Sequence, residues 1–499
     1  MMSLVIPVLA RSRNQIAFPL AVLGVSASTI AAVWALATVV DSGTLHYNLG
    51  GWAPPLGIEY VIDHVSAFVA LVVTSVATLV IISTRRWVNR EASNRQGPYY
   101  GLVMLLLAGL VGMLVTGDLF NLFVFLEVSS LAAYALVFMG GRRGMIAGFR
   151  YLIIGSIGGS FYLLGVGFLY FTTGTLNMAD MQELLTIDST ARSVEAGAVF
   201  IFAGLGLKMA LVPMHLWLPD AYTFSPSSVN SLIAPIMTKV AAYSMIRMFL
   251  SVFPDGYLTD IVPVADGLLW LGLIGMVLGS IVAGSQMDVR RMLAYSSISQ
   301  LGLIAVGIGL ATPLGFAAAL LHVMNHAVMK ATLFLSVGSV RFSTGATTVD
   351  GLIGLGKKMP LTMIAFTLSA ISMVGIPPAA GFFSKWYAVQ ASVQSGQWVV
   401  VVVILGSTLL TAVYMFRVLE RVYLRPAQPE SIPHVDLHVD GDDSHDNTDS
   451  PIAPAVLQVE EAKESPLDMV LPALILGVSA VVLGVVNSFI VTYVLETGL

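Results

Sequence analysis

The stretch GLGLKMALVPMHLWLPDAYTFSPSSVNSLIAPIMTKVAAYSMIRMF, residues 204–249, decides the fold of this chain. It reads as two membrane-spanning helices joined by a proline-rich break, with Lys208 five residues before Pro213 and Lys239 four residues after Pro235. A proline within a helix removes a backbone donor and leaves a carbonyl without its partner. At membrane depth this is tolerated only where protein or a wet cavity covers the site. We therefore expect the break to line an internal path.

The composition is that of a protein that crosses the membrane many times. Of the 499 residues, 57% are hydrophobic and 11% are charged, whereas soluble domains carry roughly a quarter charged residues. The chain has no cysteine, which excludes disulfides and iron–sulfur ligation by thiolates, and no glycine-rich nucleotide fingerprint follows a strand-like run. Any electron-transfer chemistry must therefore lie on other subunits. The formal net charge of -5 comes largely from one acidic segment near the C-terminus.

Apolar segments of the length that crosses a bilayer, about 20 residues, recur along the whole chain. We expect thirteen spans, near residues 15–40, 63–83, 98–117, 118–139, 146–172, 195–212, 229–253, 264–284, 292–311, 314–340, 361–394 (interrupted), 398–424 and 467–495. Residues 1–10 have half the required length, so we interpret them as the remnant of a fourteenth helix. They also lack the basic segment of a cleavable signal peptide. The predicted fold is an all-α polytopic membrane protein with 13–14 transmembrane helices.

The distribution of lysine and arginine predicts the orientation of the chain. If the loop with Arg11 and Arg13 is cytoplasmic, thirteen alternating spans place eighteen basic residues inside and only Arg192 outside. Omitting or inventing one span would invert every later loop and destroy this asymmetry. The C-terminal residue, Leu499, is then predicted to lie outside.

Six charged residues remain within predicted spans, where such groups are costly and usually functional. They are Glu127, Lys208, Lys239, Arg247, Lys330 and Lys385. Arg247 lies close to a span end, so we expect it to pair structurally or to reach toward the headgroups. For Lys330 by itself, a structural ion pair and a functional role both stay open. For the other four together we favour function, because four desolvation penalties are a poor way to stabilise a fold.

The segment LLHVMNHAVMKATLF carries His322, His326 and Lys330 at four-residue intervals. Residues four apart share a helix face, so these three form a polar stripe on an apolar span. Such a stripe suits proton transfer, because an imidazole can accept a proton on one nitrogen and release it from the other.

A second break lies in the segment GIPPAAGFFSK, residues 375–385, which ends with Lys385. Two interrupted helices at corresponding positions in two halves of a membrane chain indicate inverted repeats with an ion path near mid-membrane.

Glu127 and Lys208 form a predicted switch. Burial disfavours the charged form of each group, whereas an opposite charge nearby favours it. If the two side chains are neighbours, moving one away shifts the other toward its neutral form by releasing or taking a proton. A row of such pairs could pass an electrostatic signal laterally through the membrane.

Asp288, Arg290 and Arg291 begin a span on the predicted cytoplasmic side, where they can be ordinary topology anchors. The serines within residues 296–299 can hold water along an access path or mediate helix packing. Both interpretations stay open.

Residues 426–466 differ from the rest of the chain, because they are polar and acidic. His434, His438 and His445 stand among aspartates there and suggest a metal site. Their irregular spacing favours a flexible cytoplasmic linker instead. We therefore expect no bound metal and no cofactor.

Six motifs in a fixed order resemble the antiporter-like subunits of Mrp cation/proton antiporters, membrane-bound hydrogenases and respiratory complex I. They are TGDLFNLFVFLEVSSLAAYAL, TTGTLNMADM, GLGLKMALVPMHLWLPDAYTFSPSSV, DVRRMLAYSSISQLG, HVMNHAVMKATLFL and GIPPAAGFFSKW. The resemblance covers about residues 50 to 425, and GTLNMADM makes it most similar to the Mrp D subunit or the H subunit of membrane-bound hydrogenase. It implies a multi-pass protein of a prokaryotic inner membrane, assembled with other integral membrane subunits.

The resemblance also implies two inverted five-helix repeats and a role for each buried residue. The implied organisation is residues 1–97 for N-terminal helices with a truncated first one, 98–253 and 264–424 for the two repeats, 425–466 for the acidic loop and 467–499 for the last transmembrane helix. The implied proton-transfer residues are the acidic partner Glu127, the first broken-helix lysine Lys208, the bridging lysine Lys239, the axis residues His322, His326 and Lys330, and the exit-side lysine Lys385. Lysine at position 385, where one class of complex I subunit carries glutamate, argues against that class. The acidic loop is longer than the family usually has.

Three functions follow as hypotheses. The favoured one is the proton-translocating subunit of a multisubunit cation/proton antiporter that exchanges protons for Na⁺ or K⁺, without chemistry of its own. The second places the same channel in a redox-driven complex, with a hydrogenase, NADH or formate module on partner chains. The third is a scaffold that transports nothing. None of them involves nucleic acid.

Overall fold

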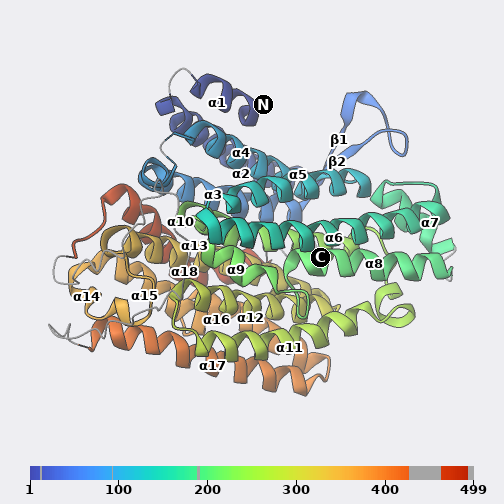
Figure 1. Ribbon diagram of the computed structural model, residues 1–499. Coiled ribbons are helices and arrows are strands. Elements are labelled where there is room, and N and C mark those ends of the chain that lie inside the picture. The colour runs from blue at the N-terminus through green and yellow to red at the C-terminus, as the bar shows by residue number, and fades with distance from the viewer. Residues whose placement is uncertain (12–13, 93, 188–190, 426–461, 493–499) are drawn as a thin grey trace, which may run out of the picture.

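The computed structural model describes residues 1–11, 14–92, 94–187, 191–425 and 462–492, most of which lie in helices packed side by side (Figure 1). Within these residues, eleven helices are long and apolar enough to cross a membrane. Two further predicted crossings are interrupted, one formed by α8 and α9 and the other by α15 and α16. The predicted all-α polytopic fold is therefore confirmed.

The N-terminal part contains three helices and a small hairpin. The bounds are α1 (Met2–Ala10), α2 (Ala17–Ser42), β1 (Leu45–Asn48), β2 (Glu59–Ile62) and α3 (His64–Glu91). The strands pair antiparallel, with Leu45 opposite Ile62. The third helix continues well beyond the predicted end at residue 83. Asp63 starts it by accepting a hydrogen bond from the Ser66 amide at 2.8 Å, while the Ser66 hydroxyl accepts from the Asp63 amide.

The next helices form two units of the same organisation. The first unit is α4 (Gln96–Val115), α5 (Leu119–Phe138), α6 (Gly141–Thr173), the broken pair α8 (Arg192–Met209) and α9 (Trp217–Phe224), and α10 (Ser227–Ser251), with the short α7 (Met178–Ile187) before the break. The second unit is α11 (Val264–Ser285), α12 (Val289–Gly309), α13 (Pro313–Thr344), the broken pair α15 (Pro360–Val374) and α16 (Ala380–Gln394), and α17 (Trp398–Tyr423). Each unit has five crossings with the fourth one interrupted. Because five is odd, the second unit starts on the opposite side of the membrane and is inverted relative to the first.

The remaining helices are short or terminal. They are α14 (Leu355–Lys358), α18 (Leu467–Val485) and α19 (Asn487–Ile490), with the single turns Asn14–Ile16, Leu49–Gly51, Tyr257–Ile261 and Asp350–Leu352. The centre of the molecule is α13, which is buried along nearly its whole length and packs against α10, α12, α16 and α18. A helix without a lipid-facing side can carry polar residues, provided that neighbouring helices supply partners for them.

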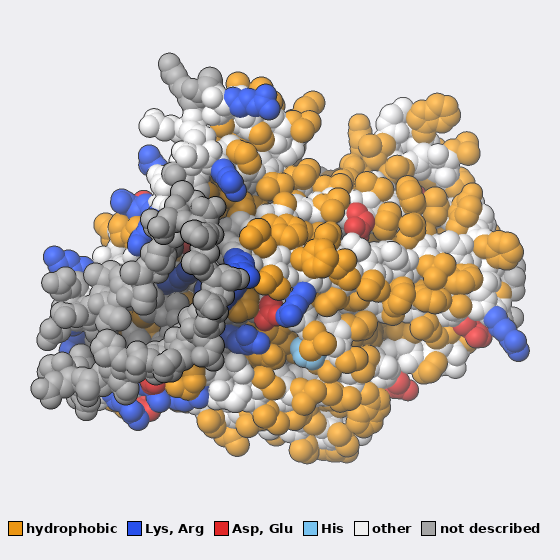
Figure 2. Space-filling model, viewed as in Figure 1, with side chains coloured by type: hydrophobic (Ala, Val, Ile, Leu, Met, Phe, Trp, Pro, Cys, Tyr) orange, Lys and Arg blue, Asp and Glu red, His pale blue; other side chains and the backbone are white. Residues whose placement is uncertain are grey.

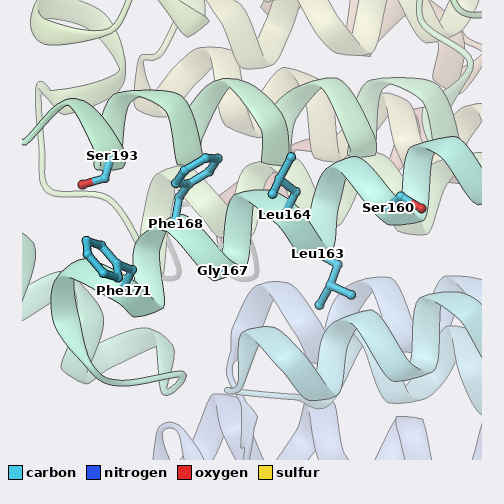
Figure 3. A pocket seen from close by; sticks show the side chains of 7 residues that line it. All are labelled: Ser160, Leu163, Leu164, Gly167, Phe168, Phe171 and Ser193. Carbon is cyan, nitrogen blue, oxygen red and sulfur yellow. The ribbon is translucent and has the colours of Figure 1, made fainter.

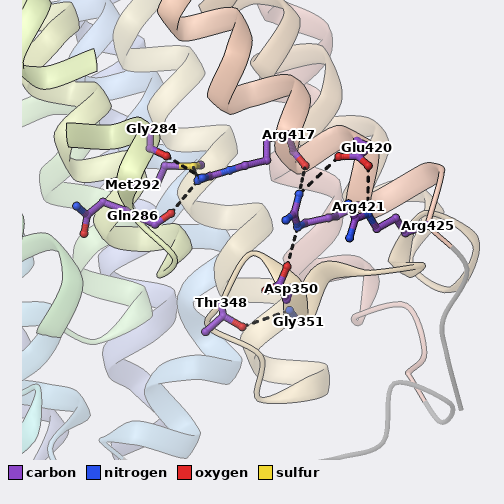
Figure 4. Close-up of polar contacts among 10 residues, drawn as sticks. All are labelled: Gly284, Gln286, Met292, Thr348, Asp350, Gly351, Arg417, Glu420, Arg421 and Arg425. Atoms are coloured by element: carbon purple, nitrogen blue, oxygen red, sulfur yellow. Dashed lines mark hydrogen bonds and ion pairs between the residues drawn. The ribbon is translucent and has the colours of Figure 1, made fainter. Parts of the chain in front are cut away.

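Basic side chains gather at one end of the helices, near α14, whereas hydrophobic side chains cover most of the visible face (Figure 2). One of these arginines, Arg417, binds the end of a helix (Figure 4). The guanidinium of Arg417 donates to the carbonyls of Gly284 at 2.7 Å and Gln286 at 2.8 Å, at the C-terminus of α11. A cation there satisfies carbonyls that the helix leaves free and complements its dipole. Arg421 binds Asp350 at 2.6 Å in the same region. This end agrees with the predicted cytoplasmic side.

Candidate functional site

The structure brings Glu127 and Lys208 together. Lys208 is 6% exposed, and its Nζ donates to the Oε1 atom of Glu127 at 3.1 Å. The same ammonium donates to the hydroxyls of Ser130 at 2.8 Å and Tyr134 at 3.3 Å. The three acceptors come from one face of α5, because residues three, four and seven apart share a face. An ammonium has three protons to donate, so the three acceptors of α5 satisfy all of its hydrogen-bond donors.

Two glycines of α6 make room for this pair, and the sequence interpretation missed them. A Cβ atom at Gly159 would collide with Oε1 of Glu127, and one at Gly155 would collide with the hydroxyl of Tyr134. Glycine at these two positions lets two of the three Lys208 acceptors, Glu127 and Tyr134, lie directly against the α6 backbone. The four-residue spacing of glycines in IIGSIGGSF is the signal that could have indicated the contact.

Gly159→Ala is expected to lower transport about tenfold without preventing assembly. The new methyl group meets the far end of a flexible Glu127 side chain, so the fold adapts, but the carboxylate must leave its position against Lys208. Ion flux in everted vesicles measures the effect, and the amount of assembled complex is the control. The matched variant Gly167→Ala, on the same helix, meets open space and should be silent. Equal activity of the two variants would contradict a close fit of Glu127 to α6.

Aromatic residues connect this pair to α10. Tyr134 contacts Tyr151 edge to face with ring centroids 4.5 Å apart, and Tyr151 stacks on Trp217 at 4.1 Å. The hydroxyl of Tyr151 donates to the Met237 sulfur on α10 at 3.0 Å. The indole of Trp217 donates to the Leu207 carbonyl at 3.0 Å, which caps the broken end of α8. Trp217 thus binds the broken end of α8 and also belongs to the row of aromatic rings that starts at Tyr134.

Lys239 lies inside the protein at the middle of α10. It is 1% exposed, and its Nζ donates to the Ala234 carbonyl at 2.7 Å and the Thr238 hydroxyl at 3.3 Å. Three titratable residues of α13, namely His322, His326 and Lys330, lie near enough to interact with it electrostatically. Lys239 therefore occupies the border between the first unit and the central helix.

The two histidines of α13 face each other. Their ring centroids are 5.9 Å apart and the rings are nearly parallel. Nδ1 of His322 lies 2.9 Å from the hydroxyl of Ser384 on α16. Among the described residues, Nε2 of His322 and both ring nitrogens of His326 have no hydrogen-bond partner. Buried ring nitrogens without partners can exchange protons with whatever reaches them.

Lys330 continues the stripe toward α12. Its Nζ donates to the Leu293 carbonyl at 2.7 Å and to the Ser296 hydroxyl. Ser299 instead bonds Ser280 of α11 at 2.8 Å and Ser407 of α17 at 3.2 Å. Of the two open interpretations of these serines, Ser299 follows the packing one, whereas Ser296 contacts the lysine.

Lys385 closes the second break. Its Nζ donates to the carbonyls of Met373 at 2.9 Å and Val374 at 3.0 Å, the last residues of α15. Gly375 follows with a φ of 89°, a left-handed conformation that suits glycine. The lysine ammonium therefore caps the interrupted helix, and it lies close enough to His322 for electrostatic interaction.

Of the two expectations for Arg247, the structure shows a pairing, and its partner is Asp63. The guanidinium donates to an Asp63 oxygen at the start of α3. Burial by itself would raise the pKa of Asp63, but the adjacent guanidinium and the Ser66 hydrogen bonds outweigh it, so this pKa lies below its ordinary value. The carboxylate is consequently ionised at neutral pH.

A large surface groove does not include any of the buried polar residues described above. A groove of about 710 Å³ lies between α6 and α8, lined by Leu163, Leu164, Phe168 and neighbours (Figure 3). Its residues are apolar apart from Ser160 and Ser193, and Phe171 is 85% exposed. The described residues contain no group of three or more side chains that could hold a metal. The histidines at 434, 438 and 445 lie outside the described residues.

Comparison with known proteins agrees with this arrangement. Residues 116–411 match the family described as NADH:quinone oxidoreductase/Mrp antiporter, TM. NADH-quinone oxidoreductase subunit N of Desulforudis audaxviator is 43% identical over 463 residues, 93% of this chain and 89% of that protein. The D subunit of a Na⁺/H⁺ antiporter from Alkalihalophilus pseudofirmus is 31% identical over 393 residues, 78% of each protein.

A solved structure shares the fold over the full length. A chain of the Mrp complex from Dietzia sp. superimposes with a TM-score of 0.87 at 26% identity, covering 100% of this chain and 95% of that one. The resemblance inferred from the six motifs is confirmed. This multi-pass membrane protein belongs to the NADH:quinone oxidoreductase/Mrp antiporter family of transmembrane subunits.

Proposed function

We propose that this chain is the proton-translocating subunit of a multisubunit Na⁺/H⁺ antiporter. One observation carries the proposal: a set of buried lysines and histidines extends across both units. In chain order, the members are the acidic partner Glu127 and the basic residues Lys208, Lys239, His322, His326, Lys330 and Lys385. Structural ion pairs would neutralise such residues. Among the described residues, however, the basic members other than Lys208 bind neutral oxygens or, in the case of His326, have no hydrogen-bond partner.

The proposed path uses each contact in turn. Protons reach the Glu127–Lys208 pair and pass to Lys239 when rearrangement of the Tyr134–Trp217 aromatic contacts admits water. They continue along the histidine stripe of α13 to Lys385. There the ammonium leaves the carbonyls at the end of α15 and releases its proton to solvent. The desolvation cost of a buried charge is offset only when an opposite charge or good acceptors lie close to it, so each proton transfer changes the free energy of protonating the next site. This coupling would let cation movement elsewhere in the complex drive the protons. We also propose residues 98–253 and 264–424 as the two repeats.

Antiport in everted membrane vesicles tests this function. The complete complex should take up Na⁺ or K⁺ in exchange for protons with no redox substrate present. The named relatives assemble in multisubunit complexes, so the assay requires co-expression with the neighbouring membrane subunits.

A second function has a specific observation in its favour. The relative that is 43% identical over 93% of this chain is a subunit of a quinone oxidoreductase. In such a complex the same residues would pump protons in response to electron transfer on partner chains. Mass spectrometry of the chains that co-purify in mild detergent separates the two. Flavin, iron–sulfur or nickel subunits indicate the pump, whereas small multi-span subunits alone indicate the antiporter.

A further inference from the structure

Beyond Lys239, the outer half of α10 carries three polar residues that the proposed path does not use. Lys239, Tyr243, Arg247 and Ser251 follow one another at four-residue intervals, so they form a stripe along one side of the helix. At 1.5 Å per residue the stripe is about 18 Å long. It leads from Lys239, at the border of the two units, to the end of the helix opposite the predicted cytoplasmic side.

A cavity of about 300 Å³ lies at that end of α10. The β1–β2 hairpin, the start of α3 and the start of α7 line it together with Arg247 and Ser251. Glu59 faces the cavity, with its Oε1 atom 2.7 Å from Nδ1 of His46 and its Oε2 accepting from the Asn177 amide at 3.3 Å. Because a water molecule takes about 30 Å³ in the liquid, the cavity has room for several waters beside ionisable groups.

Arg247 separates this cavity from the inner part of the stripe. It is 6% exposed, its Nη1 donates to Asp63, and its buried Nε has no hydrogen-bond partner among the described residues. The carboxylate of Asp63 is held in place by the Ser66 amide. On the inner side, Tyr243 lies near enough to both charges for electrostatic interaction, and its hydroxyl donates to the Leu114 carbonyl at 2.8 Å.

A guanidinium is a barrier to protons and not a carrier of them. It keeps its proton in proteins, and a fixed positive charge in a narrow polar passage repels hydronium. The Arg247–Asp63 pair therefore interrupts the stripe for proton transfer. On its inner side, the hydroxyl of Tyr243 can relay a proton. The low pKa of Asp63 keeps the pair ionised at neutral pH.

We propose that the outer cavity is a port for protons carried by water, leading past Tyr243 to Lys239, and that the Arg247–Asp63 pair holds it shut. The inference rests on the proposed function, in which Lys239 carries protons. With the port shut, a proton on Lys239 leaves along α13 toward Lys385. With the port open, the same proton equilibrates with the outside and the gradient is lost.

Proton leak through the complete complex tests the port. Proteoliposomes receive a pH gradient, with no cation gradient and no redox substrate, and a pH-sensitive dye follows its decay. Arg247→Gln is expected to speed the decay on the order of tenfold, because glutamine removes the guanidinium that closes the passage and does not release its proton. The double variant Arg247→Gln, Tyr243→Phe should return the decay to the unaltered rate.

Asp63→Asn keeps the proposal testable if the arginine variant assembles poorly. Asparagine caps helices as well as aspartate does, so α3 should form. Arg247 is then no longer held across the passage by Asp63, its guanidinium can turn into the water of the cavity, and the leak should appear. If the assembled Arg247→Gln or Asp63→Asn complex holds the pH gradient as long as the unaltered complex, the proposal is overturned. A leak that Tyr243→Phe does not reduce overturns it as well. If Lys208→Ala still transports while Arg247→Gln leaks, the proposed path fails and the port stands. If Lys208→Ala abolishes transport while Arg247→Gln does not leak, the proposed path stands and the proposed port is wrong.

Discussion

Lys208→Ala and Glu127→Gln are each expected to reduce ion transport at least about 100-fold, the scale at which one positioned proton-transfer group acts. Lys208 is the first buried cation of the path, and Glu127 is its charged partner at 3.1 Å. The alanine variant removes the proton carrier. The glutamine variant keeps the shape of the Glu127 side chain but removes the negative charge that responds when Lys208 gains or loses a proton.

The fold should survive both substitutions. Without Lys208, the side chain of Glu127 remains 24% exposed and can be hydrated. Without the Glu127 charge, Lys208 keeps the hydroxyls of Ser130 and Tyr134 as acceptors. Ser130→Ala is the matched control, because it removes one acceptor and no charge, and it should lower transport only a few-fold, as loss of one hydrogen bond of about 1 kcal/mol does. Transport in everted vesicles and the yield of assembled complex are measured together. Full activity of both charge variants in assembled complex would exclude the proposed path.

Lys239→Ala is expected to reduce transport by a similar factor, at least about 100-fold. The residue lies between the first unit and the histidines of α13, so its removal leaves no titratable side chain on α10 beside His326. Its Nζ binds only a carbonyl and a hydroxyl, which can bond to each other or to water after truncation. Assembly should therefore persist.

Lys239→Arg distinguishes a proton carrier from a fixed charge. A guanidinium preserves the positive charge but does not release its proton, so transport should stay low in this variant. Thr238→Val, which removes an acceptor of Lys239 without removing charge, should be nearly silent. High transport with arginine would show that position 239 acts only through its charge. A scaffold without transport predicts instead that Lys239→Ala changes the yield of complex and leaves flux intact.

The partners of the buried charges show where sequence reasoning stops. A charge within an apolar span is visible in the sequence, because hydrocarbon tolerates so few of them, and this made Lys208 and Glu127 candidates. Their 3.1 Å contact joins residues 81 positions apart, and no local pattern contains that information. The glycines at 155 and 159 also went unnoticed, since a small residue acquires meaning only when its neighbour across the interface is known. The same holds for Asp63, which closes the outer end of α10 from a different helix.

The sequence by itself determined the membrane class, the crossings, both helix breaks and the candidate cations of the path. Hydropathy, proline and helical spacing act within one segment, so their consequences can be read without the rest of the chain. The family resemblance implied that Glu127 is the partner of Lys208, but only the tertiary structure decided which groups bind the other buried charges. It placed the His322–His326 stripe on a helix surrounded by protein, and it set Lys385 on the carbonyls of α15 and Arg247 on Asp63. The physical reason is that desolvation and hydrogen bonding depend on which groups packing brings within about 3 Å, and packing is a property of the whole fold.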